Sequence, residues 1–302
     1  MDVDAAGKIY VALSGNNQVA KYVPSAGSFQ LDTTFNANGR IGKVDQTSGT
    51  GNGEFNAPFD VAVSPDGEEI AVSDSGNHRI QRFTKNGVFI LAFGEQGTAV
   101  GRFNSPKGLK VNSTGYLYIV DSGNNRVAVA LSSAVVGVSG SSGTALGQFQ
   151  GALNVGVGSR GIYVADTGIN RVQQFDELRG GHAAPTPFTP RGAVSIEFTL
   201  ALNQPNSVAA APDFREEKIY IADTGNNRVV LVKLPIDNPE AVWAAMKDRI
   251  NLDDLNGAIG YFSSLSAEEY RQTFSSIGLT ALKPLISQIP AITPVVIKRD
   301  TA

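Results

Sequence analysis

Asp223-Thr-Gly-Asn-Asn-Arg-Val229 decides the fold, because this short stretch recurs along the chain. The other copies are Asp74-Ser-Gly-Asn-His-Arg-Ile80, Asp121-Ser-Gly-Asn-Asn-Arg-Val127, Asp166-Thr-Gly-Ile-Asn-Arg-Val172 and the weaker Leu13-Ser-Gly-Asn-Asn-Gln-Val19. From one glycine of the copies to the next, the steps are 61, 47, 45 and 57 residues. Spacing of this size indicates a solenoid, a propeller or another repeat array.

Each copy predicts two strands joined by a tight turn. The preceding residues are rich in β-branched and aromatic side chains, which suit strands. These runs are Ile70-Ala-Val-Ser, Leu117-Tyr-Ile-Val, Ile162-Tyr-Val-Ala and Ile219-Tyr-Ile-Ala. In the turn itself, glycine and asparagine tolerate positive φ, and the aspartate can accept hydrogen bonds from nearby backbone amides.

The aspartates and arginines of the copies form a second pattern. Arginine follows aspartate by five residues in Asp74/Arg79, Asp121/Arg126, Asp166/Arg171 and Asp223/Arg228. In the first copy both are replaced, by Leu13 and Gln18. The loss of both residues in the same copy predicts that they form a bidentate ion pair, because removing one partner would leave a buried charge unpaired. A catalytic or metal-binding role is the less favoured interpretation, since a reaction needs one site and this pattern is repeated.

A glycine-rich connector precedes the second, third and fourth hairpins. It reads Gly49-Thr-Gly-Asn-Gly-Glu-Phe55, Gly97-Thr-Ala-Val-Gly-Arg-Phe103 and Gly143-Thr-Ala-Leu-Gly-Gln-Phe149. Apolar runs at 61–63, 109–111, 155–157 and 208–210 predict a first strand, and 88–93 predicts a fourth. Four antiparallel strands in about 45 residues are typical of a β-propeller blade. We therefore expect an all-β propeller of four-stranded antiparallel blades, with five units visible.

The repeat resembles the NHL repeat over residues 1–234. The resemblance lies in Ile219-Tyr-Ile-Ala-Asp-Thr-Gly-Asn-Asn-Arg-Val229 and Phe55-Asn-Ala-Pro-Phe-Asp-Val-Ala-Val63. The sequence departs from the pattern at Leu13, Gln18, Ala152 and Ile169. The resemblance implies a propeller, most often six-bladed, that usually serves as a binding platform. The family also includes enzymes and RNA binders, so fold alone does not define function.

Both ends of the chain suggest a longer parent protein. Residues 1–10 align with the end of a first strand and a whole second strand, so we expect a further blade and an export signal upstream. Either the incomplete ends pair to close a five-bladed ring or the parent has a sixth blade, and we expect the parent to be extracytoplasmic and bacterial. Residues 24–50 and 179–192 exceed a normal connector, and we interpret the second as a surface loop or a partner-contacting loop.

The repeat stops after Leu234, and residues 235–302 form a second, α-rich segment. Asn238-Pro-Glu caps a predicted helix, and Ser266-Ala-Glu-Glu269 is a capping box ahead of another. This segment resembles the opening of the small α+β domains similar to nuclear transport factor 2. The strands of such a domain would follow Ala302, so we interpret the segment as a truncated domain.

Composition restricts the chemistry. There is no cysteine, and the two histidines, His78 and His182, exclude a multi-histidine metal site. The net charge is −3, whereas a nucleic-acid binder normally carries a basic excess. No membrane span is visible. We expect no cofactor, with calcium bound by oxygen ligands in the axial channel as the open alternative.

Candidate binding residues are those exposed at the turns or departing from the repeat. Lys110 occupies a column otherwise held by Ala62, Gly156 and Ala209, and it would contact an anionic ligand or pair with a neighbouring carboxylate. The turn candidates are Asn77, His78, Asn124, Ile169 and Asn226.

These patterns favour a non-catalytic binding or scaffold propeller that recognises a protein or another ligand through loops on one face. The alternative is a hydrolase or lyase with a calcium-dependent site in the axial channel. A third hypothesis, RNA binding, would need a basic face.

Overall fold

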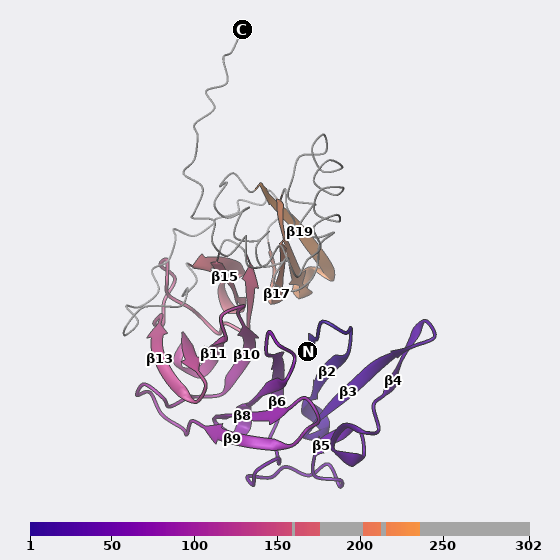
Figure 1. Ribbon diagram of the computed structural model, residues 1–302. Helices are drawn as coiled ribbons and strands as arrows, with labels where there is room; N and C mark the ends of the chain where they lie inside the picture. The colour runs from indigo at the N-terminus through magenta and orange to yellow at the C-terminus, as the bar shows by residue number, and fades with distance from the viewer. Residues whose placement is uncertain (159–160, 176–201, 213–215, 236–302) are drawn as a thin grey trace, which may run out of the picture. The chain divides into compact units, whose positions relative to one another are not determined.

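The computed structural model describes residues 1–158, 161–175, 202–212 and 216–235 (Figure 1). The chain divides into two compact units, of which the larger consists of residues 1–157, 161–209 and 221–230. The smaller unit consists of residues 158–160, 210–220 and 231–302. The hydrogen bonds, ion pairs and cleft of the blades lie within the larger unit. The predicted insertion at 179–192, His182 and the predicted α-rich segment lie outside the described residues.

Each copy of the repeat forms an antiparallel sheet, here called a blade. The first blade contains β1 (Asp2–Val3), β2 (Ile9–Leu13), β3 (Gln18–Ser25), β4 (Ser28–Leu31) and β5 (Arg40–Gly42). The second contains β6 (Pro58–Val63), β7 (Glu69–Asp74), β8 (Arg79–Thr84) and β9 (Phe89–Phe93). The third contains β10 (Pro106–Val111), β11 (Tyr116–Asp121), β12 (Arg126–Leu131) and β13 (Ala134–Ser139).

The last two blades show three strands each within the described residues. They are β14 (Asn154–Gly158), β15 (Gly161–Asp166) and β16 (Arg171–Phe175), then β17 (Pro205–Pro212), β18 (Glu216–Asp223) and β19 (Arg228–Pro235). The described residues thus form an all-β, five-bladed propeller of antiparallel sheets, which confirms the predicted fold class. A six-bladed parent stays a prediction.

Residues 24–50 form more structure than a connector. They supply β4 and β5, both of which pair with β3, and a 3-10 turn at Phe35–Ala37. Phe35 and Ile41 are buried against the first two blades. The length of this segment therefore comes from an outer edge built by β4 and β5.

The hairpin turn of each copy is a single 3-10 turn. The five turns are Ser14–Asn16, Ser75–Asn77, Ser122–Asn124, Thr167–Ile169 and Thr224–Asn226. The next residue adopts the left-handed conformation, with φ of 52°, 56°, 50°, 57° and 50° at Asn17, His78, Asn125, Asn170 and Asn227. None of the five turn glycines has a positive φ, so the asparagine or histidine that follows the 3-10 turn is the residue that adopts this conformation.

The turn glycine is required for close approach instead. Gly123 donates its backbone N–H to the carbonyl of Asn104 in the connector at 2.8 Å. A Cβ on Gly123 would lie 2.7 Å from that same oxygen and 2.5 Å from the Asn104 side chain. Gly76, Gly168 and Gly225 are similarly crowded, but a Cβ on Gly15 would meet nothing within 4 Å.

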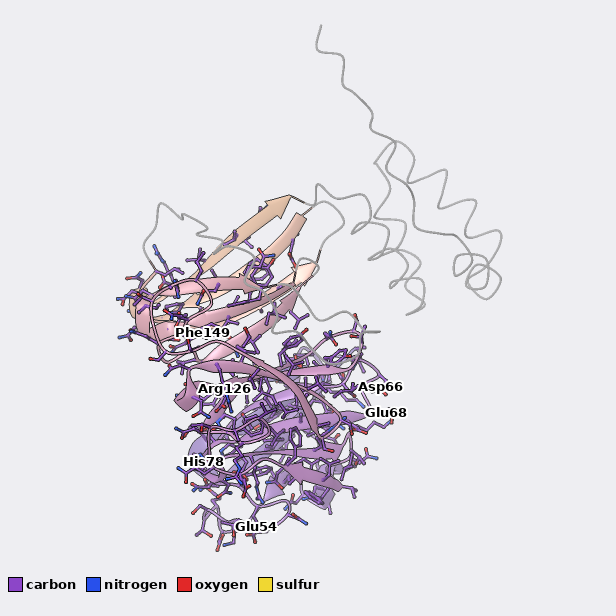
Figure 2. All side chains as sticks on the ribbon, turned by 90° about the vertical axis from the view of Figure 1, so that its left-hand side faces the viewer. Glu54, Asp66, Glu68, His78, Arg126 and Phe149 are labelled. Atoms are coloured by element: carbon purple, nitrogen blue, oxygen red, sulfur yellow. The ribbon has the colours of Figure 1, made fainter. Side chains whose placement is uncertain are left out.

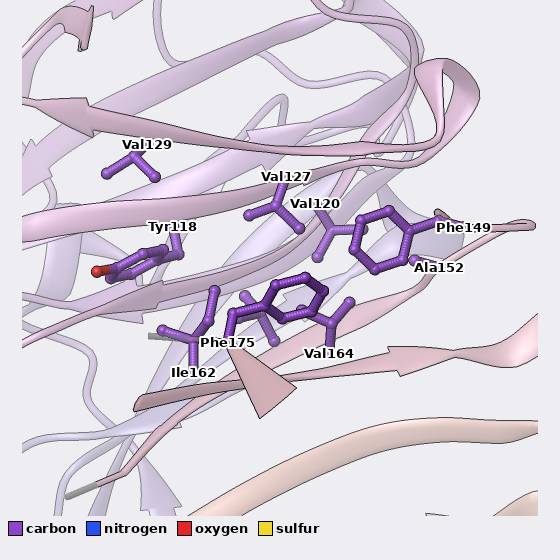
Figure 3. Packing of buried hydrophobic residues seen from close by; sticks show 10 residues of the cluster. Tyr118, Val120, Val127, Val129, Phe149, Ala152, Ile162, Val164 and Phe175 are labelled. Carbon is purple, nitrogen blue, oxygen red and sulfur yellow. The ribbon is translucent and has the colours of Figure 1, made fainter. Parts of the chain in front are cut away.

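Apolar side chains interdigitate between neighbouring blades. Between the third and fourth blades, Phe149 and Phe175 pack with 5.6 Å between ring centroids, beside Val120, Val127 and Val164 (Figure 3). The connector phenylalanines Phe55, Phe103 and Phe149 are all fully buried. Burying such a ring stabilises the fold by about 1.5–3 kcal/mol, so each connector is fixed to the core by its phenylalanine.

We predict that Gly123→Ala destabilises the protein by about 1–3 kcal/mol, because the added methyl group overpacks the contact with Asn104. Gly15→Ala is the matched control at the same place in the first blade, where space is open. Urea unfolding of both variants measures the difference. Equal stability of the two variants would contradict the close-approach explanation.

Candidate functional site

Each Asp–Arg pair lies within its own hairpin. The Nε to Oδ2 distances are 2.7 Å for Asp74–Arg79, 2.7 Å for Asp121–Arg126, 3.0 Å for Asp166–Arg171 and 2.6 Å for Asp223–Arg228. The four carboxylates are fully buried, and the arginine side chains are 10–32% exposed. A buried carboxylate of this kind needs a charged or hydrogen-bonding partner.

The arginine donates to the carboxylate through Nε alone, and its other two nitrogens donate to the connector. The predicted bidentate geometry was therefore wrong. In the third blade, Arg126 Nη1 donates to the Thr98 carbonyl at 2.6 Å. Nη2 donates to the carbonyls of Ala99 and Arg102, at 3.0 and 2.7 Å. Arg171 repeats this with Thr144, Ala145 and Gln148.

The second carboxylate oxygen accepts a backbone N–H from the same connector. Asn104 N donates to Asp121 Oδ1 at 2.7 Å, and the other three carboxylates accept the equivalent amides of Asn56, Gln150 and Asn203. Aspartate and arginine together therefore hold hairpin and connector in one network.

The electrostatic balance of these carboxylates differs between blades. Burial raises the pKa of the Asp166 carboxyl, against the hydrogen bonds from Gln150 and Arg171. Burial also raises the pKa of Asp223, but the hydrogen bonds from Asn203, Asn226 and Arg228 outweigh it and hold that pKa below its ordinary value. The donors around Asp223, and not the arginine alone, therefore lower its pKa.

The first asparagine of the turn is used inside its own blade. The Nδ2 of Asn77 donates to Asp74 Oδ2 at 2.9 Å and to the Gly49 carbonyl at 2.7 Å. Asn124 does the same with Asp121 and Gly97, both at 2.8 Å. Asn226 Nδ2 donates to Asp223 Oδ2 at 2.9 Å. Ile169 stands at this position in the fourth blade and is half-buried.

The second asparagine of the turn binds the next blade. Asn17, Asn125 and Asn170 accept, through Oδ1, the backbone N–H of Ala57, Gly151 and Gln204 at 2.8, 2.9 and 2.7 Å. His78 stands at this position in the second blade, and its Nδ1 accepts Ser105 N at 3.0 Å. We call these contacts the inter-blade hydrogen bonds. His78, a sequence candidate for binding, therefore replaces an asparagine as acceptor.

Lys110 pairs across the inner strands. Its Nζ lies 2.7 Å from Asp2 Oδ1, while Asp2 Oδ2 accepts Val63 N at 3.0 Å. The lysine side chain remains 36% exposed. Of the two outcomes foreseen for Lys110, the structure contains the ion pair with a carboxylate.

Asp60 is a second inner-strand acid that the sequence did not single out. Its Oδ2 accepts Leu109 N at 3.0 Å and Asn154 Nδ2 at 3.3 Å, and the N-terminal ammonium of Met1 contacts Oδ1. Burial raises the pKa of Asp60, against the ammonium and the amides of Leu109 and Val61. This carboxylate joins the inner strands of three blades.

In the described part of the chain, no three histidine, cysteine, aspartate or glutamate side chains are grouped so that they could hold a metal ion. The calcium hypothesis therefore remains a prediction from the sequence. No helix among the described residues is both long and apolar enough to cross a membrane.

The inner strands present four different side chains at one place in the repeat. Phe59 and Lys107 follow the buried first residues of β6 and β10. Leu153 and Asn206 follow the aligned buried residues, which lie ahead of β14 and at the start of β17. We call them the inner-strand surface. Phe59 is 38% exposed, and Lys107 Nζ lies 5.4 Å from the centre of its ring. The backbone beside this surface is held in place by the hairpin turns. The hydroxyls of Ser14, Ser75 and Thr167 donate to the carbonyls of Pro58, Pro106 and Pro205, respectively. The signal for it in the sequence was variation within an otherwise regular repeat.

Fold and geometry define a β-propeller whose blades are held by repeated Asp–Arg–connector networks. The NHL repeat family model matches residues 55–83 and 103–130, within the second and third blades. The chain thus contains NHL repeats in a β-propeller, as the sequence resemblance predicted.

Two curated relatives share this repeat. NHL repeat-containing protein 3 of Mus musculus is 28% identical over 209 residues, covering 64% of this chain and 56% of that protein. NHL repeat-containing protein 3 of Homo sapiens is 30% identical over 170 residues, covering 48% of this chain and 49% of that protein. The chain spans about half the length of these relatives.

Solved structures support the fold alone. Virginiamycin B lyase from Staphylococcus aureus is 12% identical with a TM-score of 0.50, covering 79% of this chain and 69% of that chain. A chain of a nidogen/laminin complex is 13% identical with a TM-score of 0.51, covering 76% of this chain and 73% of that chain.

We predict that Asp121 and Arg126 are energetically coupled. Arg126→Gln leaves a buried carboxylate without its cation and should cost about 3–5 kcal/mol. The double variant with Asp121→Leu recreates the Leu13/Gln18 combination of the first blade, and should cost less than the sum of the single changes by about 1–3 kcal/mol. Urea unfolding of all variants gives the coupling. Arg102→Gln, in an exposed pair with Glu95, is the control with little expected effect, and strict additivity at Asp121 and Arg126 would contradict the network.

We predict that His78 acts through its acceptor nitrogen. His78→Asn restores the residue of the other turns and should leave the free energy of unfolding within about 0.5 kcal/mol. His78→Ala loses the acceptor for Ser105 N and should cost about 1–2 kcal/mol. Denaturant unfolding at neutral pH distinguishes the two. If both variants are equally destabilised, the inter-blade hydrogen bond is not the reason for the loss.

Proposed function

We propose that this propeller is a non-catalytic binding module that recognises a protein partner through the inner-strand surface. The proposal rests on the contrast between positions of the repeat that keep the same side chain and one position that does not. Turn and connector side chains recur because hydrogen bonds and ion pairs within the blades use them. One place in the repeat instead carries four different side chains, so the contacts that hold the blades together do not determine which residue stands there. These residues are Phe59, Lys107, Leu153 and Asn206.

The chemistry of this surface suits a peptide segment with apolar and acidic side chains. Phe59 offers an exposed aromatic face, and aromatic residues are enriched among the residues that dominate interface energies. Lys107 adds a positive charge beside that ring, where it can pair with a carboxylate of the partner.

The similarity to a chain of the nidogen/laminin complex supports a role in protein assembly by analogy of fold. The similarity to virginiamycin B lyase supports catalysis on the same terms. The choice between binding and catalysis must therefore rest on a feature of this chain, and the inner-strand surface favours binding.

The test is selection of peptides from a random display library on the wild-type protein, followed by affinity measurements on variants. We predict that Phe59→Ala and Lys107→Ala each weaken the selected peptides, with a loss of about tenfold or more at Phe59. Val88→Ala removes an exposed apolar side chain ahead of the outer strand β9 and is the matched control, with unchanged affinity. Peptides that bind both inner-surface variants as well as the wild type would overturn the proposal.

A further inference from the structure

A cleft of about 190 Å³ lies between the second and third blades. Its apolar wall includes Ala62, Ala71, Val111 and Leu117, and Asp66, Glu69 and Arg82 supply its charges. Asp66 lies in the loop between β6 and β7, on the side of the blades away from the turn residue His78 (Figure 2). Phe59 of the inner-strand surface lies at the other end of β6, where Pro58 pairs with Asp74 ahead of the turn, so the cleft is a separate site.

The cleft exists because one tyrosine of the repeat is missing. The second residue of the apolar run before the turn is Tyr10, Tyr118, Tyr163 and Tyr220 in four copies, but Ala71 in the second. Tyr10 and Tyr118 are fully buried and pack against the following blade. Ala71 leaves the corresponding space between the second and third blades unfilled, because its side chain ends at Cβ.

The first blade shows what normally occupies this place. Tyr10 pairs in register with Lys21, and Lys21 Nζ lies 5.3 Å from the centre of the Tyr10 ring. In the second blade the equivalent register pair is Ala71 and Arg82. Arg82 is thus a cation at the position of Lys21, but without the aromatic ring. Its guanidinium binds Glu69 through Nη2, and a guanidinium paired at its edge can still stack its face on a ring.

The rim of the cleft is acidic. Asp66 and Glu69 outnumber Arg82, so the three charges sum to −1. Asp66 Oδ1 accepts Ser64 Oγ at 2.5 Å and Glu68 N at 3.0 Å, and these bonds lower the pKa of Asp66, with Ser64 contributing most. A carboxylate that stays ionised at the rim favours a cationic ligand.

We propose that this cleft binds a small aromatic amine. The ring of the ligand takes the place of the missing tyrosine beside Arg82, and its ammonium pairs with Asp66. The cleft, at about 190 Å³, is smaller than the pockets of about 300–1,000 Å³ that hold drug-sized molecules, so its volume suits a smaller ligand. The apolar wall and the cation select the ring, and the acidic rim selects the charge.

The test uses tyramine as the probe, since it joins the phenol ring of tyrosine to a primary amine. Isothermal titration calorimetry and saturation-transfer NMR on the whole chain compare it with 4-ethylphenol, which lacks the amine, and with ethylamine, which lacks the ring. We predict that tyramine binds, 4-ethylphenol binds more weakly, and ethylamine shows no saturable binding.

Ala71→Tyr is the decisive variant, because it restores the residue of the other blades and fills the cleft from within. We predict that it abolishes tyramine binding and raises the melting temperature. Ala92→Tyr adds the same side chain at an exposed position in β9 and should leave binding unchanged. Asp66→Asn removes the rim charge without filling the cleft and should weaken tyramine by about two- to fivefold, with 4-ethylphenol unaffected.

Three results would overturn the proposal. Tyramine could fail to bind the wild type, or it could bind Ala71→Tyr as tightly as the wild type. If Ala71→Tyr does not fold, Asp66→Asn decides, because unchanged tyramine affinity in that variant would remove the rim carboxylate from the site.

Discussion

The structure depends on a carboxylate that has been taken out of water. In each of four blades, one aspartate is fully buried, so its charge must be met by donors that the fold supplies. One oxygen receives the arginine of the hairpin and the other receives a connector amide, as at Asp121. The arginine then reaches the connector carbonyls with its remaining nitrogens. A glycine-rich loop that has few apolar contacts of its own is thereby fixed by charge and by one buried phenylalanine.

The first blade shows that this network is a solution rather than a necessity. Leu13 and Gln18 replace the pair, and Gln18 Nε2 donates to the Lys43 carbonyl at 2.7 Å. Residues 24–50 add Phe35 and, in β5, Ile41, which are both buried against the first two blades. In the first blade, hydrophobic packing therefore accompanies a neutral hydrogen bond in place of the ion pair.

The sequence was sufficient for the blades and their ion pairs, because repetition acts as an internal alignment and joint loss at Leu13 and Gln18 exposes the partners. It was insufficient where a residue's partner lies in another blade. Nothing in the neighbourhood of Lys110 indicates Asp2, which is 108 positions away. The asparagines of the turns looked available for a ligand, but their amides are used by carboxylates and connectors. The role of Gly123 was likewise hidden, since crowding by Asn104 appears only when connector and turn are folded together.

The inter-blade hydrogen bonds change what counts as one exchangeable part of this protein. Each runs from the turn of one blade to the connector of the next, as from Asn125 to Gly151. A segment cut at sheet boundaries would separate that acceptor from its donor at both cuts. A segment cut just before one turn and just before the following turn would keep each acceptor with the connector it holds. Such a cut instead separates Asp121 from Arg126, so recombination between such proteins, in evolution or in the laboratory, must break either the inter-blade hydrogen bonds or the Asp–Arg pairs.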